Sequence, residues 1–195
     1  MVDPFSQRRC MEFLNEETGC KLLWLDMEMT GLDPLQDAVL EIAVVASDIQ
    51  LETIVEGPHL IIHQSDEILD SMGQWCYEQH TASGLLDLVK ESSIDCGRAE
   101  QMILSFVGRV CSSRPLLAGN TIYQDRAFLK QYMPKIESLL HYRQIDVSSV
   151  KELVKGWYPQ NKQASFVKQK RHRALDDIFE SMNELRYYRS HFFVS

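Results

Sequence analysis

The stretch LLWLDMEMTG, residues 22–31, places Asp26 and Glu28 two residues apart inside an otherwise apolar run. Side chains alternate along a β-strand, so both acids leave one face of it while Leu25 and Met27 leave the other. Partial burial of two like charges is unfavourable unless they protonate, pair or meet a cation. The alternation alone favours a strand whose polar face meets solvent. A divalent cation becomes the better explanation only if further ligands lie elsewhere in the chain.

Hydrophobic periodicity predicts an α/β fold whose first third is rich in strands. Short apolar runs separated by turn residues predict strands at 21–29, 39–46 and 54–64, the last with a bulge or kink at Gly57-Pro58. Spacings of three and four residues then predict helices that alternate with two more strands. The later elements are expected as helices at 66–76, 99–110, 125–132 and 173–188, strands at 115–119 and 142–147, a helix that begins near Ser148 or Ser149, and a loop at 161–171. One mixed sheet packed between helices accommodates this order.

Length and composition favour one compact, soluble domain. The chain has 195 residues, of which 45% are hydrophobic and 25% charged, as is ordinary for globular proteins. We expect the domain to span residues 21–195, with 1–20 as an extension that is a disordered arm, an organelle address or a segment without function. No apolar run approaches the roughly 20 residues of a membrane span, and the first 18 residues lack a secretory signal. An intracellular protein, cytoplasmic or mitochondrial, is therefore expected.

Cysteine content and net charge exclude several other classes. The five cysteines are odd in number, widely spaced and free of any C-x-x-C pair, so we expect reduced thiols rather than a disulfide framework or a zinc site. The net charge of −8 argues against a protein that grips long nucleic acid mainly by counterion release. A small anionic ligand, met by a local basic patch or by bound divalent cations, remains compatible with it.

Two further acids are placed to join the first pair. Asp125 stands just beyond the predicted strand 115–119, where an open sheet commonly places ligands, although alone it would be a helix N-terminal acid. On the last predicted helix, a step of about 100° per residue brings Asp177 to the edge of the apolar stripe that faces the sheet. The neighbouring Asp176 points away from that stripe and is expected in solvent.

His172 immediately precedes this helix, where a histidine is usually a surface residue or a helix-entry contact. Its unperturbed pKa of about 6.5 also suits a base at neutral pH. Two Mg²⁺ or Mn²⁺ ions would be balanced by the four acids, with coordination positions left for water and a phosphate oxygen. Oxygen ligands suit these hard cations better than zinc. The residues therefore predict phosphodiester hydrolysis at a two-metal site.

These positions resemble the DEDDh exonuclease superfamily, with Asp26-x-Glu28 as its first motif, Asp125 as its second, and His172 with Asp177 as its third. The resemblance implies a fold similar to ribonuclease H, a five-stranded mixed sheet with helices around it. It assigns the four acids as metal ligands and His172 as the general base. Five blocks extend it to the oligoribonuclease family, also called small fragment nucleases, over residues 24–33, 69–76, 118–120, 142–148 and 172–189.

The oligoribonuclease resemblance implies a homodimeric 3′→5′ exoribonuclease that degrades very short RNA, dinucleotides above all, to 5′-mononucleotides. In that family an apolar wedge and a tryptophan hold the two bases, and these roles fall on Leu32 and Trp75. His80 matches a family position near the 3′ end of the substrate. Without the resemblance, Trp75 fits a core stripe with Ile68 and Met72 equally well.

The same family binds the 5′ phosphate through hydroxyl and guanidinium groups, at positions that match Thr121, Arg143 and Ser148. Thr121 replaces the serine that is usual there and keeps the hydroxyl. Tyr142 matches a tyrosine contributed across the family dimer. Charge-assisted contacts on a terminal phosphate in a closed site would select short substrates.

Two other functions stay open on the residues alone. An exonuclease of the same superfamily that trims longer strands would need a groove lined with basic and aromatic side chains, against which the net charge speaks. A catalytically silent member that binds RNA as a scaffold would not need the five intact catalytic positions. The basic run at 168–173 is either a solvated loop or a segment that steers substrate.

Overall fold

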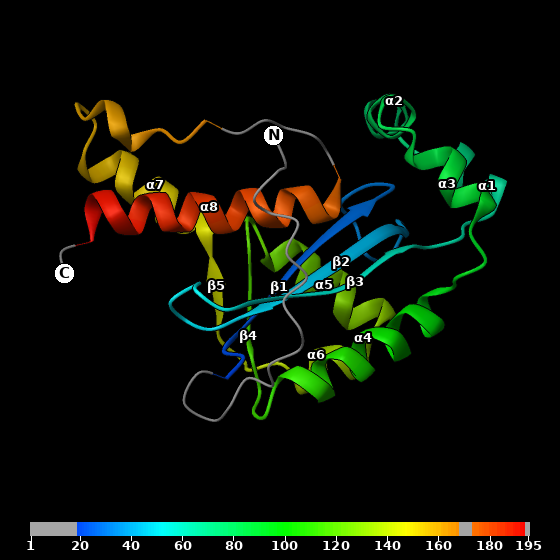
Figure 1. Cartoon of the computed structure of the whole chain (residues 1–195). Helices are drawn as coiled ribbons and strands as arrows, with labels where there is room; N and C mark the ends of the chain where they lie inside the picture. Colours follow the sequence, from blue (N-terminus) through cyan, green and yellow to red (C-terminus); the bar gives the residue numbers. More distant parts are fainter. Residues whose placement is uncertain (1–18, 168–172, 194–195) are drawn as a thin grey trace, which may run out of the picture.

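A computed structural model gives the fold of residues 19–167 and 173–193, to which the following description applies. These residues form one sheet of β1 (Leu22–Met29), β2 (Val39–Ser47), β3 (Ile54–Ile61), β4 (Leu116–Gly119) and β5 (Gln144–Asp146). The helices are α1 (Asp66–Asp70), α2 (Gln74–Ala82), α3 (Leu85–Glu91), α4 (Cys96–Val110), α5 (Tyr123–Tyr132), α6 (Pro134–Leu139), α7 (Val147–Trp157) and α8 (Ala174–Phe192), with a 3₁₀ turn η1 (Lys162–Ala164). The predicted α/β class and mixed five-stranded sheet are confirmed (Figure 1).

β1 is the central strand of this sheet, whose order is β3-β2-β1-β4-β5. It runs antiparallel to β2 and parallel to β4, and β4 runs parallel to β5. The carboxyl ends of β1, β4 and β5 therefore meet at one edge, where open sheets bind ligands. β4 pairs with residues 22–24 of β1, so the second half of β1 projects beyond its neighbour.

The two faces of the sheet carry separate apolar cores, and the alternation along β1 sorts its residues between them. Leu23, Leu25 and Met27 pack with α4 and α5 on one face. Leu22 and Trp24 pack with α8 on the other, where Asp26 and Glu28 also point. Figure 1 shows α8 lying across one face while α4 and α6 cover the opposite one.

Local chemistry moves several element boundaries away from the predicted ones. The helix expected over 66–76 divides at Gly73, which is the N-cap of α2. The helix expected to begin near Ser148 or Ser149 begins at Val147, because the Asp146 carboxylate accepts a hydrogen bond from the Ser148 amide at 2.9 Å and caps it. Helices α3 and α6 were not predicted, since both are shorter than two full turns of clear periodicity.

The predicted irregularity at Gly57-Pro58 is present. The register between β2 and β3 shifts where Ala43 pairs with His59 and Val45 with Glu56, so two residues of β3 oppose Val44. A Cβ atom at Gly57 would lie 2.6 Å from the Phe106 ring, which leaves space for glycine alone.

The expectation of reduced thiols is wrong for one pair of cysteines. Cys20 and Cys111 form a disulfide with Cα atoms 4.8 Å apart, although 91 residues separate them. Spacing could not reveal this pair, because the fold brings the start of β1 beside the end of α4. Among the described residues no helix is long and apolar enough to cross a membrane. The division of the chain at residue 20 stays a prediction, although Cys20 itself is buried in the core.

Candidate metal and phosphate site

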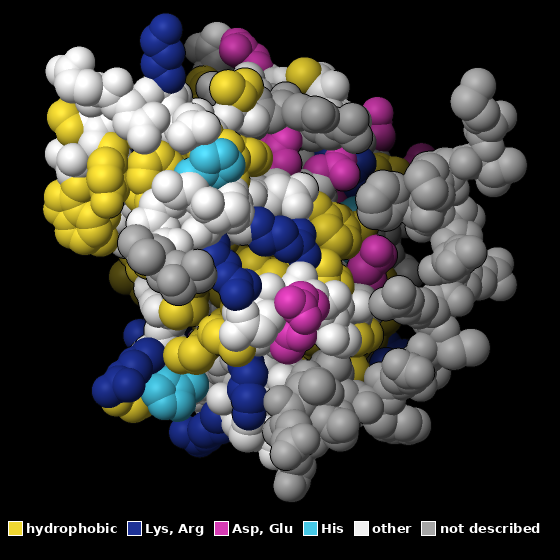
Figure 2. Space-filling model, turned by 60° about the vertical axis from the view of Figure 1, so that its left-hand side comes forward, with side chains coloured by type: hydrophobic (Ala, Val, Ile, Leu, Met, Phe, Trp, Pro, Cys, Tyr) yellow, Lys and Arg dark blue, Asp and Glu magenta, His cyan; other side chains and the backbone are white. Residues whose placement is uncertain are grey.

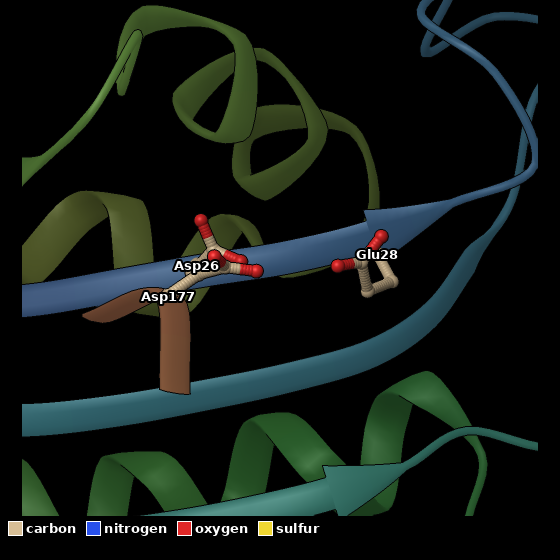
Figure 3. Close-up of side chains that lie close together, drawn as sticks. All are labelled: Asp26, Glu28 and Asp177. Carbon is tan, nitrogen blue, oxygen red and sulfur yellow. The ribbon is translucent and has the colours of Figure 1, made fainter. Parts of the chain in front are cut away.

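Three carboxylates from two distant segments meet at the end of β1. Asp26 and Glu28 leave the same face of that strand, and Asp177 reaches them from the first turn of α8 (Figure 3). Each contributes an oxygen atom, and these atoms lie within 4.8 Å of one another. The neighbouring Asp176 is exposed, as helical spacing predicted. Such a set of half-buried oxygen atoms could hold a divalent cation.

Asp125 stands beside this cluster and is not one of its three members. Its Oδ1 accepts a hydrogen bond of 3.0 Å from the amide of Met27, the residue between the two acids of β1. That amide is available because β4 does not extend this far along β1. Burial raises the pKa of Asp125 to about 7; the hydrogen bonds from backbone amides lower it, and the charge of Asp146 raises it.

Crowding of acids also perturbs Glu28. Burial, followed by the charges of Asp177, Glu41 and Asp125, raises the pKa of Glu28 to about 8, and Arg173 lowers it. The Nδ1 atom of His80 lies 3.9 Å from Glu28 Oε2. A cation that binds the carboxylates would stabilise their ionised forms, so the raised pKa values are what an acidic metal site without its ions is expected to have. The donor set fits Mg²⁺ or Mn²⁺.

A pair of hydroxyl groups lies at the carboxyl ends of the next two parallel strands. Thr121 follows β4 and Ser148 follows β5, and their side-chain oxygens are 3.1 Å apart. The Asp146 carboxylate accepts a hydrogen bond from the backbone amide of each. Thr121 has a φ of 53°, which is rare for a β-branched residue and is often kept at functional sites.

Asn120 joins this hydroxyl pair to α8, and no role was predicted for it. Its Nδ2 atom lies 2.7 Å from Ser181 Oγ and 3.1 Å from Glu184 Oε2, while its Oδ1 accepts from Ser148 Oγ at 2.9 Å. Glu184 is buried and also accepts from the Tyr188 hydroxyl. An asparagine in a turn after a strand gives no signal of a buried partner 64 residues away, so spacing could not have found this contact.

The loop before β5 carries Tyr142 and Arg143, both exposed. The Arg143 guanidinium lies 5.2 Å from the centre of the Tyr142 ring. The buried Arg126 holds this loop, because it donates to the carbonyl oxygens of His141 and Tyr142 and also contacts Glu137. Sequence reasoning missed Arg126, since a lone arginine on a helix is usually solvated. Arg143 precedes β5, whereas Ser148 follows it, and no hydrogen bond among the described residues joins Arg143 to the hydroxyl pair.

The residues predicted to hold bases are large apolar side chains that remain in solvent. Leu32 is 73% exposed on the loop after β1, and Trp75 is 67% exposed on α2. Trp75 is therefore not part of the apolar core, which was the alternative for it. The side chain of Gln124 donates to the carbonyl oxygen of Leu32, and His80 Nε2 lies 2.9 Å from the carbonyl oxygen of Met29. These contacts hold the first part of the loop that carries Leu32. The predicted base, His172, lies outside the described residues.

Comparison with known proteins supports the fold and the family resemblance. Residues 23–185 match the Exonuclease (RNase T) family model. Relatives named oligoribonuclease include those of Marinobacter nauticus, 50% identical over 90% of this chain and 97% of the relative, and of Ruthia magnifica, 49% identical over 92% and 98%. Among solved structures, exonuclease I from Methylocaldum szegediense has a TM-score of 0.70 at 15% identity and covers 89% of this chain. This chain spans 41% of that larger protein, so the likeness concerns the fold alone, of the ribonuclease H type.

The raised carboxyl pKa values predict an unusual pH dependence of stability without metal. Between the ordinary carboxyl pKa of about 4 and the native values of about 7 and 8, the folded state binds more protons than the unfolded state. In EDTA the melting temperature should therefore fall as the pH rises from 5.5 to 8. Saturating Mg²⁺ should raise it more at pH 8 than at pH 5.5, because the cation binds the ionised acids. In Asp125→Asn, the fall of the melting temperature with pH and the greater effect of Mg²⁺ at pH 8 should both weaken. If the melting temperature of the native chain in EDTA does not depend on pH, the raised pKa values of these acids are wrong.

The helical position of Asp177 predicts that it and Asp176 differ in metal binding. Asp177→Asn should weaken Mn²⁺ binding on the order of 100-fold, since one of three clustered carboxylates is lost, whereas Asp176→Asn should change it less than about twofold. Isothermal titration calorimetry on both variants measures this directly. Equal losses in the two would show that the cluster is not the binding site.

Proposed function

This chain belongs to the exonuclease family whose members include the oligoribonucleases, and from this premise we propose that it is a 3′→5′ exoribonuclease acting on very short RNA. The preferred substrates would be dinucleotides, hydrolysed to 5′-mononucleotides. The observation that carries the proposal is that two groups of polar side chains lie at the same edge of the sheet. The carboxylate cluster lies at the carboxyl end of β1, and the hydroxyl pair lies just beyond the carboxyl ends of the parallel strands β4 and β5. One substrate could then place its scissile phosphate at the first and its 5′ phosphate at the second.

Asp26, Glu28, Asp125 and Asp177 would hold two Mg²⁺ or Mn²⁺ ions. Bound there, the ions would neutralise the carboxylates, activate a water molecule and stabilise the leaving oxygen. We assign to His172 the removal of the proton from the attacking water as its oxygen bonds to phosphorus. The bond between phosphorus and the 3′ oxygen of the preceding nucleotide would break on the opposite side, and that oxygen would take a proton from water to become a hydroxyl group. The raised pKa values of Glu28 and Asp125 support the metal assignment, because both acids need a nearby cation to ionise fully at neutral pH.

Leu32 and Trp75 would hold the two bases by apolar contact and stacking. Base stacking on an aromatic side chain contributes about 1–3 kcal/mol and tolerates any base, which suits an enzyme that clears fragments of mixed sequence. Both side chains are exposed in the free chain, so they are available to a ligand. His80, next to Glu28, would lie near the 3′ end of the substrate.

Thr121, Arg143 and Ser148 would bind the 5′ phosphate. Hydrogen bonds between charged groups and phosphate are roughly twice as strong as neutral ones, so a terminal phosphate would supply much of the affinity of a small ligand. The network through Asn120 and Asp146 supports this assignment, because it holds the two hydroxyl groups in place before any ligand arrives.

The surface charge favours a short substrate over a long strand. On the described part of the face in Figure 2, lysine and arginine side chains are scattered among hydrophobic and acidic ones and form no continuous basic track. Affinity for long nucleic acid depends largely on neutralised phosphates. With a net charge of −8, the chain would rely on a few local contacts instead. The protein would act in the cytoplasm or in the mitochondrion, since RNA fragments arise in both compartments.

The length of the substrate is the property that tests this function. Initial rates on 5′-phosphorylated RNA of two to seven nucleotides, in excess Mn²⁺, should fall at least about tenfold from the dinucleotide to the heptamer, because only a short strand fits between the two sites. Rates that stay flat or rise with length would identify a strand-trimming exonuclease. Binding without turnover would identify a scaffold protein.

We also propose that the chain forms a homodimer in which Tyr142 reaches the site of the other copy. Exposed Tyr123 and Tyr142 border a hollow of about 430 Å³ formed by α5, α6 and the loop before β5, a surface suited to a partner. Sedimentation velocity should give the mass of a dimer, and Tyr142→Glu should shift it toward monomer. Leu88→Asp, at an exposed apolar position on α3, is the matched control and should leave the dimer intact. A monomeric native chain would exclude the proposal.

A further inference from the structure

A partly buried ion pair joins the beginning of α8 to the sheet. Arg173 is the N-cap of that helix, and its Nε lies 3.1 Å from Oε1 and 3.3 Å from Oε2 of Glu41 on β2. His59 on β3 also contacts the Glu41 carboxylate through Nε2. Glu41 is fully buried, whereas the Arg173 side chain is 29% exposed. One carboxylate thus connects the helix to two strands.

The position of Glu41 is unusual for an acid. Its strand neighbours on the same face, Ala43 and Val45, pack with α8 in an apolar core. A buried carboxylate is tolerated only where cations or hydrogen-bond donors meet it, and an apolar side chain of similar size would often be at least as stable there. The fold therefore retains an acidic side chain on β2 where that strand meets the beginning of α8.

That place adjoins the carboxylate cluster. Glu41 pairs with Glu28 across the β1 and β2 ladder. The carbonyl oxygen of Arg173 accepts a hydrogen bond of 3.0 Å from the amide of Asp177, which closes the first turn of α8. Arg173 is thus one helical turn from a clustered carboxylate and next in sequence to His172. In Figure 1 this end of α8 lies over β1 and β2.

We propose that Arg173 and Glu41 are positioning residues that fix where α8 begins, and so hold Asp177 against Asp26 and Glu28. Neither residue touches substrate in this scheme, and His59 supports Glu41 from the neighbouring strand. The inference rests on the proposed metal-dependent function, but it concerns the metal ligands and not the choice of RNA.

The test compares two arginines of the same region. Arg173→Gln should weaken Mn²⁺ binding about 10- to 100-fold by calorimetry, as loss of an outer partner of a metal ligand does. The kcat on a 5′-phosphorylated dinucleotide should fall similarly, while KM stays within about twofold because the base and phosphate contacts lie on other elements. Arg186→Gln is the matched control: Arg186 also joins α8 to the sheet side, through a 2.6 Å hydrogen bond to the Leu51 carbonyl oxygen, but about two and a half turns from Asp177. It should leave Mn²⁺ binding within about twofold.

Conservative and paired variants separate positioning from general stability. Arg173→Lys keeps the charge and should restore most of the Mn²⁺ affinity. Glu41→Gln should lower the affinity in the same direction as Arg173→Gln. The double variant should lose less than the product of the two single losses, because removing both partners leaves no unpaired charge.

Two results would overturn the inference. One is Mn²⁺ affinity within about twofold of the native chain in folded Arg173→Gln. The other is an equal loss in Arg186→Gln, which would mean that any loosening of α8 has this effect. Since Mn²⁺ binding is measured without RNA, a flat rate across substrate lengths would refute the proposed substrate and leave this inference standing. If Glu41→Gln fails to fold, the partly exposed Arg173 still decides the question.

Discussion

Repulsion among carboxylates at the end of β1 is the constraint on which the rest of the site depends. Three carboxylates lie within 4.8 Å, and the fully buried Glu41 pairs across the ladder with one of them. At an effective dielectric constant of about 20, two unit charges 4 Å apart repel by about 4 kcal/mol, which is comparable to a large part of the net stability of a domain. Such a cluster persists in a native fold only if other contacts hold its members in place. The raised pKa of Glu28 reflects burial first and then this repulsion, whereas the raised pKa of Asp125 reflects mainly burial.

Those other contacts come from the different lengths and directions of neighbouring strands. β4 stops short of the end of β1, which leaves the Met27 amide for Asp125. On the opposite side of β1, β2 runs antiparallel and brings Glu41 to the beginning of α8. Apolar packing of Ala174, Ile178 and Met182 against Leu22 and Trp24 then holds the helix to the sheet, with Asp177 on its inner edge. The site is thus built by the same alternation of side chains that builds the two cores.

Sequence patterns were sufficient where one physical rule dominates. Alternation along residues 22–29 separated the acids from the core residues, and a helical step of 100° separated Asp177 from Asp176. The patterns failed where a contact joins distant segments. The spacing of Cys20 and Cys111 does not predict their disulfide, and the sequence around Asn120 does not predict its hydrogen bond to Glu184. Trp75 was ambiguous because periodicity describes which residues share a helix face and not whether that face is covered. The predicted helix divides at Gly73, so Trp75 does not continue the apolar stripe of the residues before it. Leu69 and Met72 are buried, and Trp75 is exposed.

An acidic chain can bind the proposed anionic substrate because that substrate carries few phosphates. A long strand offers many phosphates, and a protein that binds it gains from a basic surface of matching length. A dinucleotide offers so few phosphates that one arginine, two hydroxyl groups and the bound cations would meet its charge, and the remaining affinity would have to come from its bases. Leu32 and Trp75 would suit that need, because both present large apolar surfaces to water without adding charge. Acidic side chains over the rest of the surface would then act against longer strands by repulsion, so the net charge would itself contribute to selection by length.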